Sequence, residues 1–380
     1  MAGQQILVLG AGYTGMLAAL GVARRTRRHD VRVTLVNAGG RFTERLRLHQ
    51  VASGQELADL RIPEMLEGTG IAFVQGRVAG IGAEVRLEDG QYLPYDTLVY
   101  ALGGVTDTET VPGVAAHAWT LDSPQVAAGF ARRLGEIGKV VVTGGGLTGV
   151  EAAAEIAESH PDLRVVLLSR EVPGAMMGEK ARAHLHGALE RLGVEVRTGV
   201  EVVKVQPDGV ELADGEVVDA GAVLWTCGVR VASLAAEAGF SVDAWGRIVV
   251  DRTLRSVSHP NVYAVGDAAA VQQPYGVIHG TCQSGMPTAA HTAASIARQV
   301  RGREPKNFRF GYIHQPVSLG RRDAVVQFTR PDDTPRRFFL TGKRAVAYKE
   351  FVSGSPWKTF RMLKVFGGAV VWPHGGRATR

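Results

Sequence analysis

The stretch ILVLGAGYTG, residues 6–15, decides the fold, because a short apolar run leads directly into a turn that contains three glycines. Four apolar residues are too few for a helix, whereas the Ala- and Leu-rich segment that follows, to about Arg28, is typical of one. Residues 31–36, VRVTLV, then alternate as a second strand should. This order of strand, glycine turn, helix and strand predicts a parallel βαβ unit.

The same pattern returns 134 positions later, from Gly10 to Gly144. Residues 139–143, KVVVT, enter the turn GGGLTG, the helical segment VEAAAEIAES follows, and residues 164–168, RVVLL, close the unit. Each unit is followed by short strands around an Asp-Gly turn, at residues 89–90 and 214–215. An internal repeat of this kind predicts two dinucleotide-binding units.

The glycines of each turn have separate physical tasks. Gly10 permits the tight turn, Gly12 lets a pyrophosphate approach the backbone, and Gly15 lets the helix pack on the strand. The phosphates are expected at the helix N-terminus, where unpaired N–H groups favour negative charge. A single GxGxxG could be a plain strand-to-helix turn, but its recurrence in the same context favours two binding sites.

The position that commonly holds a ribose-binding acid, at the end of the second strand of each unit, is Asn37 in the first and Ser169 in the second. Asn37 can still hydrogen-bond a ribose hydroxyl. Arg170, next to Ser169, can pair with a 2′-phosphate, so NADPH is a candidate as well as NADH; a solvated loop charge is the alternative interpretation. Asp267, after a strand and a glycine, can bind a polyol chain or cap a helix.

Composition excludes several classes of protein. The net charge of +6 over 380 residues is spread along the chain, which argues against nucleic acid as a partner. Cys227 and Cys282 are the only cysteines, and the histidines show no ligand spacing, so neither a disulfide framework nor a metal site is expected. No apolar run is long enough to cross a bilayer and no basic segment precedes the first one, which predicts a cytoplasmic protein. A homodimer is left open.

The predicted fold class is α/β, with two Rossmann-like dinucleotide-binding domains and a smaller α+β C-terminal domain. The predicted boundaries are 1–120 and 245–302 for the first domain, 121–244 for the second and 303–380 for the third. Ser123-Pro124 should begin a helix that ends near Leu134, and a long helix is expected over about 283–301. In the third domain VVQF, RFFL and AVAY resemble strands.

Five motifs carry a family resemblance: GAGYTG, YALGG at 100–104, GGGLTGVE, LWTCG and VYAVGDAA. Their order resembles that of the two-dinucleotide-binding-domain flavoproteins, the pyridine nucleotide-disulphide oxidoreductase superfamily, over about the first 300 residues. The resemblance implies that the two Rossmann-like domains are arranged as in the glutathione-reductase-like fold. Within it, the chain looks most like the type II NADH dehydrogenases and the NAD(P)H:quinone oxidoreductases related to apoptosis-inducing factor and the ferroptosis suppressor. This finer resemblance rests on RFTERLRLHQVASGQ at 41–55, SLGRRDAVVQF at 318–328 and SPWKTFR at 355–361.

The resemblance implies FAD in the first unit and NADH or NADPH in the second. A hydride would pass from NAD(P)H to flavin N5, and electrons would then pass to a quinone-like acceptor. Val78 would lie near the adenine, and Asp267 on the ribityl chain or phosphate. In all, the predicted cofactor-binding residues are Gly10, Gly12, Tyr13, Thr14, Gly15, Asn37, Val78, Ala101, Gly103, Gly144, Gly146, Leu147, Thr148, Gly149, Ser169, Arg170, Gly228, Gly266 and Asp267.

The resemblance also implies three catalytic residues: Glu151, Gln283 and Lys358. Glu151 matches a family glutamate near the nicotinamide and the flavin, although it could instead form a capping box with Thr148. Gln283 matches a flavin contact, but the second glutamine of the type II NADH dehydrogenases is missing, which puts quinone in doubt as the acceptor. Lys358, beside Trp357, matches an acceptor-side segment.

Each of these positions in the C-terminal segment has an alternative. Trp357, Phe360 and Leu363 have the spacing of an apolar stripe on a docking helix. The basic and aromatic residues between Lys349 and Phe366 could instead meet an anionic membrane surface, so that peripheral membrane association of the protein through this domain is a further hypothesis.

Other functions stay open at this point. A tailoring oxidoreductase for a planar secondary metabolite, a redox-responsive NAD(P)H-binding flavoprotein with little turnover, and a reductase for a ferredoxin-like protein are compatible with the same motifs. Disulfide-reductase chemistry is excluded by the absence of a CxxxxC pair.

Overall fold

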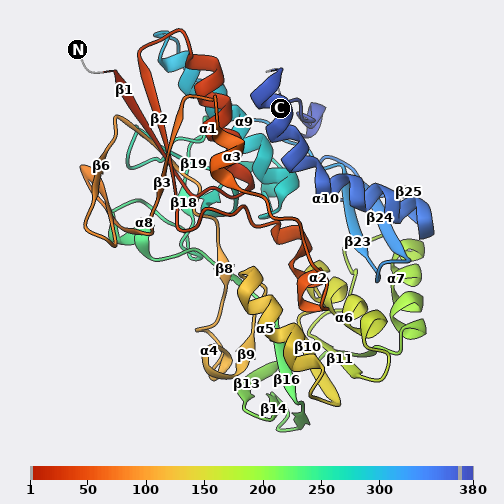
Figure 1. Cartoon of the computed structure of the whole chain (residues 1–380). Coiled ribbons are helices and arrows are strands. Elements are labelled where there is room, and N and C mark those ends of the chain that lie inside the picture. Colours follow the sequence, from red (N-terminus) through yellow and green to blue (C-terminus); the bar gives the residue numbers. More distant parts are fainter. Residues whose placement is uncertain (1–2, 367–369, 380) are drawn as a thin grey trace.

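Two five-stranded parallel sheets organise the computed structural model, which describes residues 3–366 and 370–379 (Figure 1). The first sheet has the order β19-β7-β1-β2-β3 and its strands are all parallel. Its central strand carries the apolar run of residues 6–9, which is completely buried. The strands are β1 (Gln4–Leu9), β2 (Val31–Asn37), β3 (Ile71–Gln75), β7 (Thr97–Tyr100) and β19 (Val262–Ala264).

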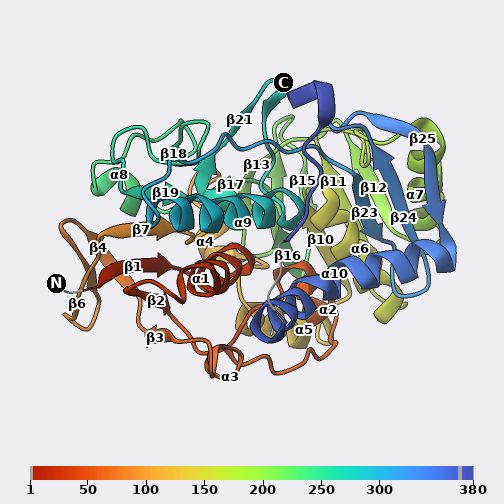
Figure 2. The same cartoon turned by 90° about the horizontal axis from the view of Figure 1, so that it is seen from above.

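Helices α1 (Tyr13–Thr26) and α9 (Cys282–Gln299) lie side by side against the first sheet (Figure 2). Gly21 makes this close approach possible, because a Cβ there would lie 2.8 Å from the Cβ of Ala293. Thr281 caps α9 in a capping box with Ser284. The long helix expected over 283–301 is therefore confirmed, with a start one residue earlier and an end two residues earlier.

The second sheet repeats this plan with the order β12-β11-β10-β16-β9, again fully parallel. Its strands are β9 (Ala118–Trp119), β10 (Lys139–Thr143), β11 (Arg164–Ser169), β12 (Glu195–Thr198) and β16 (Ala222–Trp225). Its helices are α5 (Pro124–Leu134), α6 (Leu147–Ser159) and α7 (Glu179–Arg191). Ser123 caps α5 as predicted, accepting a hydrogen bond from the N–H of Val126 at 3.2 Å.

The two sheets are linked by a short antiparallel ribbon of β8 (Val105–Thr106) and β17 (Val229–Arg230). Strand β9 already pairs with β16, so the chain has entered the second sheet by residue 118. The division of the chain into domains stays a prediction. Each predicted Asp-Gly turn joins two antiparallel strands, and Gly90 and Gly215 both have positive φ. These sheets comprise β4 (Val78–Ile81), β5 (Glu84–Leu87) and β6 (Tyr92–Pro94), and β13 (Val202–Gln206), β14 (Gly209–Leu212) and β15 (Val217–Asp219).

The C-terminal part forms an antiparallel sheet covered by one long helix. The elements are β23 (His314–Ser318), β24 (Ala324–Thr329), β25 (Pro335–Thr341) and α10 (Gly342–Val365). VVQF and RFFL are strands as predicted, but AVAY is not: residues 345–348 belong to α10. The prediction failed because Ala345, Lys349 and Ser353 are buried at four-residue spacing, a helical period that four residues cannot reveal.

Short elements complete the chain. They are η1 (Arg45–Arg47), α2 (Leu48–Ala52), α3 (Ile62–Leu66), α4 (Val114–His117), α8 (Leu234–Glu237), β18 (Ile248–Val249), η2 (Gly266–Ala268), β20 (Ala269–Ala270), β21 (Gln272–Gln273), β22 (Gly276–Val277) and η3 (Gly376–Thr379). Within the described residues, every helix is too short or too polar to span a bilayer.

Candidate functional site

The first glycine turn connects β1 to α1 and has the geometry that its sequence predicts. Gly10 adopts φ +92°, and a Cβ there would lie 2.5 Å from the carbonyl oxygen of Ala101. A Cβ on Gly15 would lie 1.7 Å from the carbonyl oxygen of Gly10, so helix and turn touch directly. By contrast, the space in front of Gly12 is open to at least 4 Å. The turn thus leaves room for a diphosphate at the start of α1.

The second turn, between β10 and α6, reproduces this arrangement position by position. Gly144 adopts φ +105°, a Cβ on Gly149 would lie 1.9 Å from the carbonyl oxygen of Gly144, and the space in front of Gly146 is open. This turn borders a cavity of about 820 Å³, whose other walls include Ser169, Arg170, Thr226 and Gly228. A cavity of this size accommodates a nucleotide.

Four other predicted residues lie around the first turn. The side-chain oxygen of Asn37 accepts a hydrogen bond from the N–H of Ala11 at 2.9 Å, so Asn37 holds the glycine turn itself. Asp267, in η2, is half-buried, and burial raises the pKa of its carboxyl above the usual value while Arg45 opposes the shift. Thr14 packs against Gly266, where a Cβ would lie 2.8 Å from the Thr14 methyl. The turn, η2 and the start of α9 therefore meet at one point.

Five further predicted cofactor residues lie on elements of the two dinucleotide-binding units. Tyr13 follows the first turn, and its hydroxyl accepts a hydrogen bond from the N–H of Leu46 at 3.4 Å. Gly103 adopts a positive φ beyond the end of β7, and Val78 begins β4, half-buried. In the second unit, Leu147 and Thr148 form the first turn of α6. Their roles in binding stay predictions.

Glu151 lies on the next turn of α6 and is buried. Its Oε1 is 2.8 Å from the Lys349 ammonium and accepts a hydrogen bond from the N–H of Ser318 at 3.0 Å. Burial alone would raise the pKa of Glu151, but Lys349, His49 and the Ser318 N–H outweigh it, and the pKa lies below its usual value. The capping-box alternative is wrong, because Gly146 is the N-cap and Thr148 lies inside the helix.

Gln283 uses its side-chain amide to fasten α9 to β23. Its nitrogen donates to the carbonyl of His314 at 2.8 Å, and its oxygen accepts from the N–H of Ile313 at 2.8 Å. The flavin contact predicted for Gln283 stays a prediction, but the amide already has these two backbone partners. Beside it, burial raises the pKa of the Cys282 thiol to about 11.

The catalytic lysine predicted from the C-terminal motif, Lys358, is exposed on α10. The lysine that contacts the predicted catalytic residue Glu151 is Lys349, more than two turns earlier on the same helix. Trp357 is half-buried, with its ring 5.2 Å from that of Phe42, and Phe360 is completely buried. These contacts support the docking-helix interpretation of the apolar stripe.

Comparison with known proteins agrees with this geometry. A model of the pyridine nucleotide-disulphide oxidoreductase family matches residues 4–297. The chain belongs to this family. An NADH dehydrogenase-like protein from Mycobacterium tuberculosis is 31% identical over 351 residues, covering 84% of this chain and 87% of that protein. A type II NADH:quinone oxidoreductase from Staphylococcus aureus is 26% identical over 390 residues, covering 92% and 94%.

Two solved structures share the fold of this family member over nearly its whole length. The sulfide:quinone oxidoreductase from Aquifex aeolicus has a TM-score of 0.81 and 18% identity, covering 96% of each chain. The NDH2 from Plasmodium falciparum, in complex with NADH, has a TM-score of 0.79 and 15% identity, covering 96% of this chain and 99% of that one. The fold expected from the five motifs is thereby confirmed, and it extends into the C-terminal domain.

Sequence reasoning missed three groups around Glu151: His49, Ser318 and Lys349. They come from three distant segments, and none of them belongs to a motif that predicts contact with α6. A signal existed for Lys349 alone, because it lies on the helical face that also buries Ala345 and Ser353. A lysine on a buried face requires a partner of opposite charge.

Proposed function

We propose that the protein is an FAD-dependent NAD(P)H oxidoreductase that passes electrons to a quinone. The observation that carries this proposal is the matched pair of glycine turns, of which the second opens onto the 820 Å³ cavity. Hydride transfer from a nicotinamide to a flavin requires that one chain bind two dinucleotides, NAD(P)H and FAD. The relatives from M. tuberculosis and S. aureus are an NADH dehydrogenase-like protein and a type II NADH:quinone oxidoreductase.

The first turn and η2 would hold FAD, with the open space at Gly12 for the pyrophosphate and the half-buried Asp267 on η2 nearby. When bound, FAD supplies the two-electron chemistry that joins a hydride donor to the acceptor. The second turn would hold the pyrophosphate of NAD(P)H at the start of α6. The walls of the cavity beside this turn would orient NAD(P)H, and orientation is the chief contribution of the chain in such a reaction.

Glu151 contributes a fixed negative charge one turn inside α6. Lys349 and the Ser318 N–H hold its carboxylate ionised and in one orientation. A carboxylate fixed in this way costs no reorganisation when a nicotinamide binds beside it. We therefore assign Glu151 to orienting the nicotinamide and Lys349 to neutralising Glu151.

The cavity favours NADH over NADPH. Arg170, the candidate partner of a 2′-phosphate, lies 3.5 Å from Glu201, and Glu171 also lines the cavity. Two carboxylates near the ribose end repel a phosphate of about −2 charge, and one arginine that is already paired compensates only in part. NADPH should therefore be accepted, but more weakly.

An anaerobic titration of the yellow protein tests the proposed function. We expect NADH to bleach the flavin absorbance at lower concentration than NADPH does, and a short-chain quinone to restore it. The variant Glu151→Gln tests the role of Glu151 in the same titration. It should still bind flavin, but NADH should reduce that flavin more slowly, because the nicotinamide loses its orienting charge. A preparation that binds no flavin, or whose flavin NADH does not reduce, would rule the function out.

The cysteines favour quinone reduction without sulfide chemistry. Burial raises the pKa of both thiols, that of Cys282 to about 11, so both are protonated at neutral pH. A protonated thiol is a poor nucleophile toward sulfur. The sulfide oxidation named for the A. aeolicus structure is accordingly not part of the proposal.

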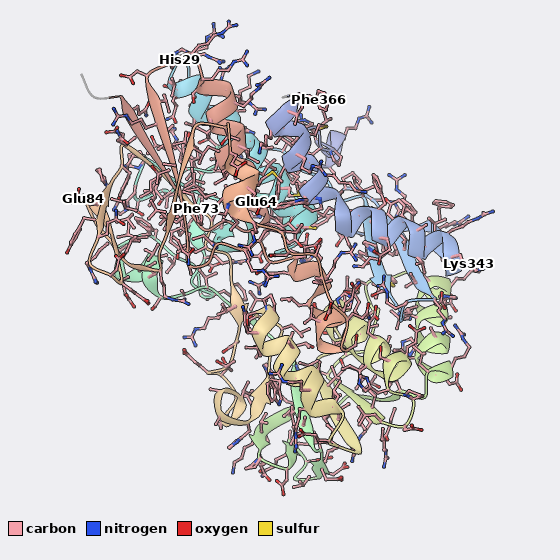
Figure 3. All side chains as sticks on the ribbon, in the orientation of Figure 1. His29, Glu64, Phe73, Glu84, Lys343 and Phe366 are labelled. Carbon is pink, nitrogen blue, oxygen red and sulfur yellow. The ribbon has the colours of Figure 1, made fainter. Side chains whose placement is uncertain are left out.

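We further propose that the C-terminal end of α10 meets an anionic membrane surface. Met362, Val365 and Phe366 expose 43%, 63% and 79% of their surface, and Lys358 and Arg361 are exposed among them. Figure 3 labels Phe366 at this end of the helix and Lys343 at the other. Apolar side chains interleaved with cations are typical of a helix that lies in the interface of a membrane. Lys349, one of the basic residues first assigned to such a surface, is buried at Glu151.

Vesicle sedimentation at low salt tests this attachment. Binding to vesicles with anionic lipid should fall at least about tenfold in a Val365→Ser/Phe366→Ser variant, since about 1.4 kcal/mol or more of apolar burial is lost. Phe338→Ser is the matched control, because Phe338 is exposed to 61% on β25, away from this end of α10. Equal binding by all three proteins would remove the membrane proposal. A homodimer stays a prediction.

A further inference from the structure

His49 lies between two carboxylates of the same helix. It belongs to α2, is exposed to only 3%, and faces α6 with both ring nitrogens. Nδ1 is 3.8 Å from Oε2 of Glu151, and Nε2 is 3.8 Å from Oε1 of Glu155. The hydroxyl of Ser318 lies 3.3 Å from Nε2. Glu151 and Glu155 are one helical turn apart, so a single imidazole bridges them.

The far end of this arrangement reaches solvent. Oε1 of Glu155 is 3.3 Å from the Arg321 guanidinium, which in turn is 2.6 Å from Glu350. The side chains of Arg321 and Glu350 are each about one-third exposed, whereas Glu155 is completely buried. The near end is the Glu151–Lys349 pair, which the proposed function places beside the nicotinamide. A continuous row of polar groups therefore runs from the surface to that site.

Burial, helped by nearby cations, keeps the His49 ring neutral. Burial lowers the pKa of His49 to about 4; Glu151 opposes this shift, and Lys349, Arg321 and Arg47 add to it. Burial raises the pKa of Glu155 above its usual value, although Arg321 and Gln55 oppose it. A neutral imidazole can accept a proton at one nitrogen while it donates from the other, and a carboxyl with a raised pKa is a suitable source.

We propose that His49 relays protons from Glu155 to Glu151, and that this relay serves the reduction of the acceptor. The inference rests on the proposed function. NADH, one proton and a quinone give NAD⁺ and a quinol, so the hydride brings two electrons and one hydrogen, and the second hydrogen must enter as a proton from solvent. Glu155 gives this proton to Nε2 of His49 while Nδ1–H passes one to Oε2 of Glu151, and Glu151 passes its proton on to the acceptor and is ionised again. Glu155 is reprotonated from solvent, and a flip of the His49 ring returns its N–H to the side of Glu151.

The relay needs only small movements. Each 3.8 Å separation must shorten to the range of a hydrogen bond, about 2.7–3.2 Å, which side-chain rotation achieves. Because His49 touches neither cofactor nor acceptor in this scheme, it is a positioning and relay residue. Its loss should affect the half-reaction that consumes a solvent proton and leave the other half-reaction unchanged.

Stopped flow on His49→Gln in the holoenzyme separates these half-reactions. Reduction of the flavin by NADH should keep its rate. Reoxidation by a short-chain quinone should slow by about 100-fold, the lower end of what a positioned acid–base group contributes, and should show a larger solvent isotope effect and a steeper fall with rising pH. Glu155→Gln should give the same pattern. His184→Gln, on α7 and bonded to Asp323, is the control and should change neither half-reaction.

A readout that does not depend on turnover is the ¹⁵N spectrum of histidine-labelled protein. It should show a neutral His49 at pH 7 whose signals move in Glu155→Gln. The relay is overturned if reoxidation and its isotope effect are unchanged in His49→Gln, or if both half-reactions slow alike with a loss of stability. Failure of the proposed function differs, because the wild-type flavin would then resist reduction by NADH at the first step.

Discussion

Replacing Lys349 with methionine is expected to lower the free energy of unfolding by about 3–5 kcal/mol, the usual cost of removing one partner from a buried ion pair. The ammonium lies 2.8 Å from Glu151, and both side chains are only 9% exposed. Without it, Glu151 would keep a buried charge with His49, a neutral ring, and the N–H and hydroxyl of Ser318 as its partners among the described residues. Urea unfolding of the holoprotein measures the difference.

The effect of this substitution should depend on pH. In the wild type the folded pKa of Glu151 is depressed, so its pairing stabilises the protein above the unfolded pKa, and this contribution is lost as the pH falls through the folded value. In Lys349→Met the carboxylate has lost the partner that held its pKa down. The gap in stability between wild type and variant should therefore be wide at neutral pH and narrow in acid.

Two further variants isolate the ion pair. Lys358→Met changes an exposed lysine of the same helix and should alter stability by no more than about 0.5 kcal/mol. Lys349→Met combined with Glu151→Gln removes both charges and should recover most of the loss. If Lys349→Met were as stable as Lys358→Met, the ion pair of Lys349 and Glu151 would not stabilise the folded protein.

The sequence allowed the two glycine turns to be predicted because their requirements are local. Each turn needs a positive φ at its first glycine, Gly10 or Gly144. It also needs a close contact between that glycine and the glycine five residues later, Gly15 or Gly149. Such constraints leave glycine as the only residue that fits, and the spacing of the glycines is then readable. The strands and helices on either side followed from short apolar runs for the same reason.

The environment of Glu151 could not be predicted, because it is assembled from segments far apart in the chain. His49 follows the first unit, whereas Ser318 and Lys349 belong to the C-terminal domain. Lys349 and Lys358 both looked like members of one basic cluster, and only the packing of α10 separates the buried lysine from the exposed one. The helical period of α10 was hidden by treating residues 345–348 as a strand.

The largest functional effect is expected at Gly146, where alanine should abolish nucleotide binding without harming the fold. A Cβ at this position meets no atom within 4 Å, and the backbone there is extended with φ −66°, so stability should stay within about 0.5 kcal/mol of wild type. Yet the added methyl would occupy the place proposed for the pyrophosphate at the start of α6. We expect the affinity for NADH to fall by about 100-fold or more, as contacts to charged oxygens worth about 3 kcal/mol are lost.

Two neighbouring glycines make this result interpretable. Gly149→Ala places a Cβ 1.9 Å from the carbonyl oxygen of Gly144. This overpacked contact should lower the free energy of unfolding by about 1–3 kcal/mol, and the variant should also bind NADH more weakly. Gly138→Ala, just before β10, also meets open space but lies away from the turn, and should change neither quantity. All three variants should stay yellow, because the first turn is untouched. Calorimetric titration with NADH measures the binding affinity of each variant, and urea unfolding measures its stability. If Gly146→Ala bound NADH as tightly as Gly138→Ala does, the second turn would not be a dinucleotide site. The proposed electron donor would then have no place to bind.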